Sequence, residues 1–518
     1  MSEPRDTGAM ATDRLASGVA LLIALLGIGW RLVDLTEWPF PVFESVQYES
    51  AMASRALWLT VDPSARTPER MAWFEQARYQ HIVSPPILPA LVASSYAVAG
   101  EEIPWTSKLF AAAFWAGAGC FVYATVIRQT GCRWGGVVAL GFLMFEPFGL
   151  MVSRSFQTES VAVFGLALGA WHLSRPDRGL RWRETIVAGL VCGAAGLAKP
   201  GTLLPPLAAA FASQMLATGI AGRTPRKIAC VALFTLLLAL PSGLYVAFKL
   251  SGRGSEIQPH LLGGIEFYEG QLRMIRNTVG VRALALGLAG ALLAARRGWT
   301  LTLGLFAGHA VYLGIFTIHS PTHEYYQTIL IALIALGLGW IVAELIHAIS
   351  ALGGRSPRKA LVLAAIVVAG LIRYAYVAKI PTTGPWRYGS RIRPVLAESR
   401  ARQERAVEAV RAARDAMGPD ARPVALTDEY GYVFEYSANL RVVVWPRKAD
   451  LAFLIAAGLD KPGLTAEDRL DALIAAGRTH LVVVDFIEYD LWPDLKAALA
   501  RRGRLSRSGP DTLVYELR

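Results

Sequence analysis

Long apolar runs recur along the first 380 residues, and they restrict the fold more than any other feature of the chain. A helix needs about 20 mostly apolar residues to cross a membrane, and the sequence contains about eleven runs of this kind. Because backbone groups without partners are costly in lipid, such runs cross as helices. We therefore predict a mainly α-helical, polytopic membrane protein. The predicted spans cover roughly residues 15–33, 105–127, 134–152, 156–173, 184–198, 200–218, 228–249, 279–295, 299–318, 325–348 and 359–379.

Composition agrees with a membrane protein. The chain is 54% hydrophobic and 18% charged, with a mean hydropathy of +0.38, which is too apolar for a soluble globular protein. A net charge of +12 would suggest nucleic acid in a soluble protein, but here the basic residues form short clusters between apolar runs. The first run, Leu15 to Leu32, is not followed by a small-residue cleavage site, which favours a retained span. The four cysteines, Cys120, Cys132, Cys192 and Cys230, lie within or beside the cytoplasmic ends of predicted spans, which argues against a disulfide framework.

The basic clusters also orient the chain. If the N-terminus is cytoplasmic, every predicted cytoplasmic loop is basic, as the positive-inside rule requires. We therefore predict a multi-pass protein of the inner (cytoplasmic) membrane. The extracytoplasmic side then holds residues 34–104, 153–158, Lys199, 250–278, 319–324 and everything after 380. The basic residues in question are Arg128 and Arg133; Arg175, Arg178, Arg181 and Arg183; Arg223, Arg226 and Lys227; Arg296 and Arg297; and Arg355, Arg358 and Lys359.

Two domains are expected. Residues 1–380 form the transmembrane domain, in which the first external loop, 34–104, carries two helices that lie at the membrane interface. Residues 385–518 are more charged and form a small extracytoplasmic α/β domain. It contains no glycine-rich phosphate-binding loop. Its helices are predicted at 395–417, 465–477 and 490–502, and its strands at 423–427, 441–445, 480–485 and 512–517.

The first chemical feature is a carboxylate just outside the first span. Glu44 begins the first interfacial helix, and Tyr48 lies four residues later on the same face. A single glutamate in a loop is usually solvated surface. A carboxylate partly removed from water, however, is suited to act as a general base.

Further ionisable groups fall on the same side of the membrane. Arg154 and Glu159 border the turn between two spans, either as an ion pair that closes a helical hairpin or as part of a phosphate site. Lys199 separates two apolar runs, and it either reaches for lipid headgroups or points into a cavity that receives an anion. Their position on one face favours a site there.

A histidine- and tyrosine-rich segment begins the tenth span. His319 and His323 have the spacing of metal ligands, but Pro321 interrupts the helix that such a site would need. Tyr325 and Tyr326 are also ordinary interfacial residues. His81 precedes Pro85 and Pro86 at the start of the second interfacial helix and is a further candidate for substrate contact. The segment in question reads His319-Ser320-Pro321-Thr322-His323-Glu324-Tyr325-Tyr326-Gln327.

The order of these motifs resembles that in the integral-membrane GT-C glycosyltransferases, in the branch that includes protein O-mannosyltransferases and the aminoarabinose transferase of lipid A. The resemblance covers about residues 40–335. Members of that branch carry a D-E-x-x-Y motif after the first span, where this chain has Glu44, Ser45 and Tyr48. The remaining matches are Pro85-Pro86-Ile87-Leu88-Pro89, Ser153-Arg154 with Glu159, Leu197 with Lys199, and His323-Glu324-Tyr325-Tyr326.

The resemblance implies transfer of a sugar, with inversion, from a polyprenyl-phosphate carrier to an acceptor hydroxyl on the extracytoplasmic face. Glu44 takes the place of the catalytic aspartate, and Ser45 replaces the second carboxylate, so no metal is expected, and a divalent ion is the alternative. The implied donor-phosphate ligands are Arg154, Lys199, His323 and Tyr326, and the implied sugar or acceptor contacts are Glu159, Tyr48, His81 and Tyr325.

Several alternatives remain open at this point. A transporter or flippase of a lipid-linked sugar would share the spans and the cations but would not need a base at Glu44. A membrane scaffold is the other rival. The acceptor is expected to be a glycan or glycolipid rather than a protein, because of the external C-terminal domain. The sequence identifies neither the sugar nor the oligomeric state.

Overall fold

The computed structural model describes most of the chain, and its two compact units are treated separately. Unit 1 comprises Met1–Thr36, Val83–Leu91 and Trp105–Val395, and unit 2 comprises Glu37–Ile82, Val92–Pro104 and Leu396–Arg518. The described residues are 7–36, 44–67, 70–71, 85–175, 181–199, 201–218, 225–249, 259–353, 362, 370, 392–418, 420–448, 451, 455 and 461–518.

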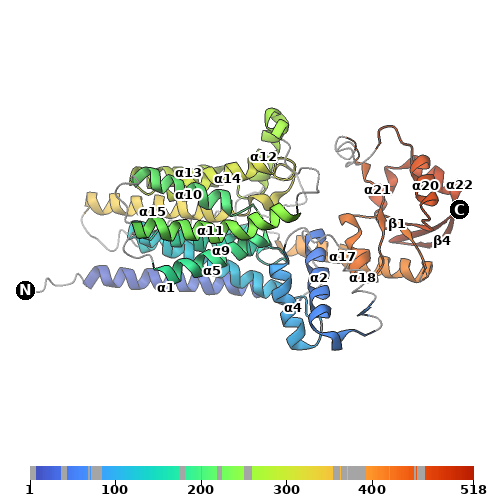
Figure 1. The fold of residues 1–518 in the computed structure, drawn as a ribbon, viewed down its shortest axis with the longest axis horizontal. Coiled ribbons are helices and arrows are strands. Elements are labelled where there is room, and N and C mark those ends of the chain that lie inside the picture. The colour runs from blue at the N-terminus through green and yellow to red at the C-terminus, as the bar shows by residue number, and fades with distance from the viewer. Residues whose placement is uncertain are drawn as a thin grey trace, which may run out of the picture. The chain divides into compact units, whose positions relative to one another are not determined.

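Unit 1 is a helical bundle whose long helices run side by side (Figure 1). The N-terminal end of helix α15 is packed inside the bundle, because every residue from Ile329 to Leu336 is at most 2% exposed. The helices of the bundle are α1 (Thr7–Leu32), α5 (Thr106–Thr130), α6 (Arg133–Phe145), α7 (Pro147–Val152), α8 (Glu159–Leu173), α9 (Trp182–Ala198), α10 (Leu204–Thr218), α11 (Pro225–Lys249), α13 (Val281–Arg296), α14 (Leu301–Ile315) and α15 (Leu330–Gly353).

Local sequence explains how these helices break and how closely they pack. Between α6 and α7, the Glu146 side chain accepts a hydrogen bond of 2.6 Å from the Gly149 amide, and Pro147 begins the new helix. Where α13 passes α15, a Cβ atom on Gly290 would lie 1.9 Å from the carbonyl oxygen of Gly337. Only glycine permits this approach.

Helix length gives a lower span count than the sequence predicted. Among the described residues, four helices are long and apolar enough to cross a membrane, or five if the bent pair of α12 (Ile265–Asn277) and α13 is counted as one span. Helices cover the predicted spans from 15–33 to 325–348, but many are shorter than a membrane-crossing helix. The count of about eleven is therefore not confirmed, and the span predicted at 359–379 lies almost entirely outside the described residues.

Unit 2 combines part of the first external loop with the C-terminal α/β region. It contains α2 (Glu44–Val61), the C-terminal part of α4 (Ile87–Ala99), α17 (Ile392–Met417) and α18 (Tyr432–Ala438). Its five-stranded sheet has the order β2-β1-β3-β5-β4, in which β1 pairs in parallel with β2 and β3, and β5 pairs antiparallel with β3 and β4. The strands are β1 (Pro423–Leu426), β2 (Val443–Val444), β3 (His480–Val483), β4 (Gly503–Gly509) and β5 (Thr512–Leu517).

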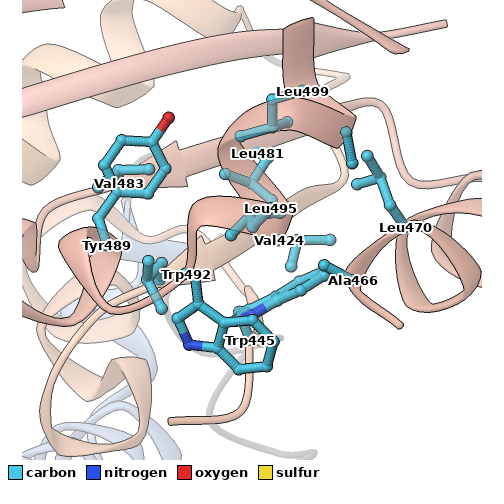
Figure 2. Close-up of a cluster of buried hydrophobic side chains, with 12 residues drawn as sticks. Val424, Trp445, Ala466, Leu470, Leu481, Val483, Tyr489, Trp492, Leu495 and Leu499 are labelled. Carbon is cyan, nitrogen blue, oxygen red and sulfur yellow. The ribbon is translucent and has the colours of Figure 1, made fainter. Parts of the chain in front are cut away.

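A buried apolar cluster holds the sheet to its helices (Figure 2). Leu481 of β3 is fully buried with Leu470 of α20 (Ala466–Ala475) and Leu495 of α22 (Pro493–Arg502). Trp445 and Trp492 meet edge to face, with ring centroids 5.6 Å apart. Burial of each leucine contributes about 2 kcal/mol to the stability of this region.

Candidate functional site

Lys199 lies at the centre of a polar and aromatic cluster in unit 1. It follows α9 directly as its C-cap residue, and its Nζ donates a hydrogen bond of 2.9 Å to Oε1 of Glu159. The same ammonium lies 4.7 Å from the ring centroids of both Tyr325 and Tyr326. The side chain of Lys199 is 14% exposed and that of Glu159 is 4% exposed. The cluster therefore holds a cation in surroundings where an anion would interact with it strongly.

The start of α8 contributes the carboxylate and several further polar groups. Glu159 is the first residue of this helix, where the helix dipole favours a negative charge. Its second oxygen, Oε2, is buried and has no hydrogen-bond partner among the described residues, and the same holds for both side-chain amide atoms of Gln157 and for Oγ of Ser160. Buried polar groups are normally paired. Unsatisfied groups beside a buried ion pair are suited to bind a polar ligand.

Aromatic residues form a second wall of this cluster. The 3-10 helix η4 (Glu324–Gln327) carries Tyr325 and Tyr326, and the Tyr326 ring stacks on Tyr312 and on His319 at centroid distances of 5.9 and 6.2 Å. The His323 ring lies 6.3 Å from that of Tyr326. Burial, assisted by the nearby His319, lowers the pKa of the His323 imidazole to about 4. At neutral pH His323 is therefore neutral and can donate one hydrogen bond, but it supplies no positive charge.

Arg154 belongs to a second group of cations in unit 1. Its guanidinium donates to the carbonyl oxygen of Val33, and burial lowers its pKa, although Asp34 opposes that shift. The preceding residue, Ser153, accepts a 2.7 Å hydrogen bond from Nε of the fully buried Arg31. Lys108 is 7% exposed, and its ammonium interacts electrostatically with the nearby guanidinium of Arg154.

Sequence reasoning missed Lys108 and Arg31, and one of its two alternatives for Glu159 was an ion pair with Arg154. A signal was available, since a basic residue within a predicted span usually faces a site or the protein interior. The sequence interpretation connected Glu159 with Arg154, whereas in the structure Glu159 pairs with Lys199. The structure thus brings Glu159, Lys199, His323, Tyr325 and Tyr326 together and places Arg154 with Arg31 and Lys108.

Glu44 and Tyr48 lie in unit 2, on α2. Glu44 is the first residue of that helix, its side chain is 14% exposed, and one carboxylate oxygen lies 3.0 Å from a guanidinium nitrogen of Arg402 on α17. Tyr48 is buried, and its ring lies 5.4 Å from that of Tyr436. Burial raises the pKa of the Tyr48 hydroxyl, and the neighbouring Glu44 adds to this. His81 lies outside the described residues.

Metal ligation finds limited support in this geometry. The rings of His319 and His323 are 5.4 Å apart. Within the part of the chain that the structure describes, no three histidine, cysteine, aspartate or glutamate side chains gather as a metal-binding group.

Comparison with known proteins identifies both a matching segment and a shared fold. Residues 83–245 match the family model for dolichyl-phosphate-mannose-protein mannosyltransferase. This segment includes Arg154, Glu159 and Lys199. No curated protein matches the sequence.

Solved structures resemble nearly the whole chain. ArnT from Cupriavidus metallidurans in the apo state is 14% identical, with 97% of this chain and 98% of that chain covered and a TM-score of 0.53. The oligosaccharyltransferase AglB from Archaeoglobus fulgidus, in complex with an inhibitory peptide and a dolichol-phosphate, is 14% identical, with 97% and 74% covered and a TM-score of 0.54. An Archaeoglobus fulgidus oligosaccharyltransferase in the apo form is 13% identical, with 97% and 74% covered and a TM-score of 0.55.

These findings confirm the predicted resemblance to the GT-C membrane glycosyltransferases. At such low identity the solved structures establish the fold alone. The roles of individual residues and the chemistry therefore rest on the two clusters and on α2.

Proposed function

We propose that this protein is a membrane glycosyltransferase that moves a sugar from a polyprenyl-phosphate donor to an acceptor hydroxyl on the extracytoplasmic face, with inversion at the anomeric carbon. The observation that carries the proposal is the Lys199 cluster. It joins a buried cation, a carboxylate and two tyrosine rings, and both members of its ion pair lie in the segment that matches a mannosyltransferase family model.

The donor phosphate would bind to Lys199 and Arg154. An ammonium held between a carboxylate and two ring faces turns toward a phosphate with little reorganisation, because it is already mostly withdrawn from water. Arg154, with the ammonium of Lys108 nearby, adds further positive charge. Both charges stabilise the negative charge that grows on the leaving phosphate.

The sugar would contact the aromatic wall and the start of α8. Tyr326 contributes its hydroxyl, and neutral His323 donates a hydrogen bond. Oε2 of Glu159 and the amide of Gln157 are free to accept and donate hydrogen bonds to sugar hydroxyls. Tyr325 contributes its ring to the same wall.

Glu44 would act as the general base. Its carboxylate takes the proton of the acceptor hydroxyl while the acceptor oxygen bonds to the anomeric carbon. The bond from that carbon to the phosphate oxygen breaks, and the electron pair leaves with the polyprenyl phosphate. A single displacement of this kind inverts the anomeric configuration.

The acceptor is proposed to be a glycan or glycolipid, because unit 2 joins the helix that carries Glu44 to a folded α/β region that could present a polymeric substrate. A protein acceptor is the second candidate, and the specific observation in its favour is the match to a protein mannosyltransferase model.

The decisive variant is Glu44→Gln, tested in purified full-length protein with dolichyl-phosphate mannose as the probe donor. Loss of a positioned base should reduce sugar transfer about 10²- to 10⁴-fold. Donor binding should remain, since the amide keeps the shape of the carboxylate. Glu49→Gln on the same helix is the matched control and should transfer normally. Near-normal transfer by Glu44→Gln would remove this residue from the mechanism.

Mass spectrometry of the lipid that co-purifies in mild detergent tests the donor class independently. A polyprenyl-phosphate sugar supports the proposal and names the sugar. Recovery of bulk phospholipid alone, even after polyprenyl-phosphate sugars are added, contradicts it. Movement of an intact donor across reconstituted vesicles, without cleavage, would instead favour a flippase.

A further inference from the structure

The face of α2 that carries Glu44 is the face that contacts the C-terminal part of unit 2. Residues 44, 48 and 55 are separated by four and seven positions, so at about 100° per residue they lie within about 40° of one another on the helix. Each contacts a residue from the second half of the chain or from the α4–α5 connection. The candidate base therefore lies on a stripe that the rest of unit 2 covers.

Arg55 anchors the far end of this stripe. Arg55 is 6% exposed, and its guanidinium donates to both carboxylate oxygens of Glu102 at 2.9 and 3.2 Å and to the carbonyl oxygen of Tyr436 at 3.2 Å. It also lies 4.1 Å from the centroid of the Tyr436 ring, and the hydroxyl of Tyr436 donates to Glu102. A bidentate pair with a stacked ring is a geometrically specific contact.

Tyr48, in the middle of the stripe, and Glu44, at its beginning, also contact the C-terminal part of unit 2. Tyr48 lies beside the same ring of Tyr436, at 5.4 Å. Glu44 pairs with Arg402 of α17 at 3.0 Å. The buried contacts at Arg55 and Tyr48 fix where α2 lies, and Arg402 then reaches the carboxylate at its first residue. The two partners are 358 positions apart in the sequence.

We propose that Arg402 is a positioning residue for Glu44, so that the C-terminal region of unit 2 orients the general base in addition to any acceptor it binds. This inference rests on the proposed role of Glu44. Arg402 holds the carboxylate in one rotamer at the helix N-terminus, where the first-turn amides and the side chain would otherwise sample several arrangements. It contacts neither donor nor acceptor.

Hydrogen–deuterium exchange on the full-length protein in detergent tests the structural half of the inference without any substrate. In Arg402→Ala, amides from Tyr48 to Met52 should exchange about two- to fivefold faster, which matches the small free energy of a partly exposed ion pair. Arg402→Lys should restore most of the protection. Arg405→Ala, which removes an exposed arginine one turn along α17, should exchange like the wild type.

A double-mutant cycle shows whether Arg402 acts through Glu44. In a Glu44→Gln background, Arg402→Ala should cause little additional exchange, because the partner charge is already absent. An equal increase in both backgrounds overturns the inference, as does unchanged exchange in Arg402→Ala alone.

Kinetics test the functional half, with dolichyl-phosphate mannose as the donor, water as the acceptor and released mannose as the product. Arg402→Ala should lower kcat about 10- to 100-fold and leave KM for the donor within about twofold, and Arg402→Lys should recover most of kcat. A rise in KM with unchanged kcat would assign Arg402 to donor binding and overturn the inference. If the wild type releases no mannose, the proposed donor fails and the exchange cycle alone decides the positioning role.

Discussion

Replacement of Lys199 by methionine should destabilise unit 1 strongly, and the reason lies in its partner. Lys199→Met keeps the length and apolar character of the side chain but removes the ammonium. Glu159, only 4% exposed, then loses the cation 2.9 Å away. Its Oε2 has no hydrogen-bond partner among the described residues, so the carboxylate is left buried and uncompensated.

The structure sets the expected magnitude. At 2.9 Å and an effective dielectric constant of about 20, the attraction is about 6 kcal/mol before desolvation is counted. Desolvation of both ions offsets most of that gain, so the intact pair contributes little net stability. Removal of one partner leaves the desolvation cost of the other charge uncompensated. We therefore expect Lys199→Met to lower the free energy of unfolding by about 3–5 kcal/mol. The double variant Lys199→Met with Glu159→Gln should return to within about 1 kcal/mol of the wild type.

Thermal unfolding in detergent and sugar transfer separate the two roles of the lysine. The double variant should recover stability but not transfer, because the phosphate-binding cation remains absent. Arg297→Met provides the control, since the Arg297–Glu344 pair of the same unit is largely exposed on the arginine side and should contribute less than about 1 kcal/mol. A double variant as unstable as Lys199→Met alone would refute the reasoning.

Two further predictions concern pH and the C-terminal core. Because burial lowers the pKa of His323 from 6.5 to about 4, the unfolded chain binds an extra proton between these values; stability is therefore full above about pH 6.5 and falls as the pH drops toward 4. His323→Asn should flatten that loss by about 3 kcal/mol in thermal unfolding followed from pH 4 to 7, and an unchanged profile would contradict the assignment. Leu481→Ala, at a fully buried position in the core of Figure 2, should cost about 2–5 kcal/mol, whereas Leu505→Ala on the exposed edge strand β4, where the leucine is 49% exposed, should cost less than about 1 kcal/mol in the same measurement.

The secondary structure was largely predictable because periodicity is local. Four expected strands of the α/β region are present as β1, β2, β3 and β5. The fifth, β4, was missed because its sequence, GRLSRSG, is polar and its side chains are mostly exposed at the sheet edge. Such a strand is specified by its pairing with β5 rather than by an apolar pattern.

The site was predictable as a set of residues but not as a set of contacts. Ionisable residues beside apolar runs pointed to Arg154, Glu159 and Lys199. Their spacing did not show that Glu159 would pair with Lys199, 40 residues away. Lys108 was overlooked because it lies within an apolar run, where one basic residue hardly changes the hydropathy.

The buried polar residues of α2 explain why the C-terminal region cannot be removed without affecting this helix. Gln47, Ser54 and Arg55 are buried in this helix, and a buried arginine without its partners is costly. Those partners are Glu102 and Tyr436. Removal of residues 396–518 would therefore expose Tyr48 and leave Arg55 with only part of its contacts, so α2 would lose the surface that orders it. A truncated protein that failed to transfer sugar would not distinguish acceptor binding from placement of the base. Only substitutions that leave the Arg55 anchor intact, such as those at Arg402, separate these two contributions.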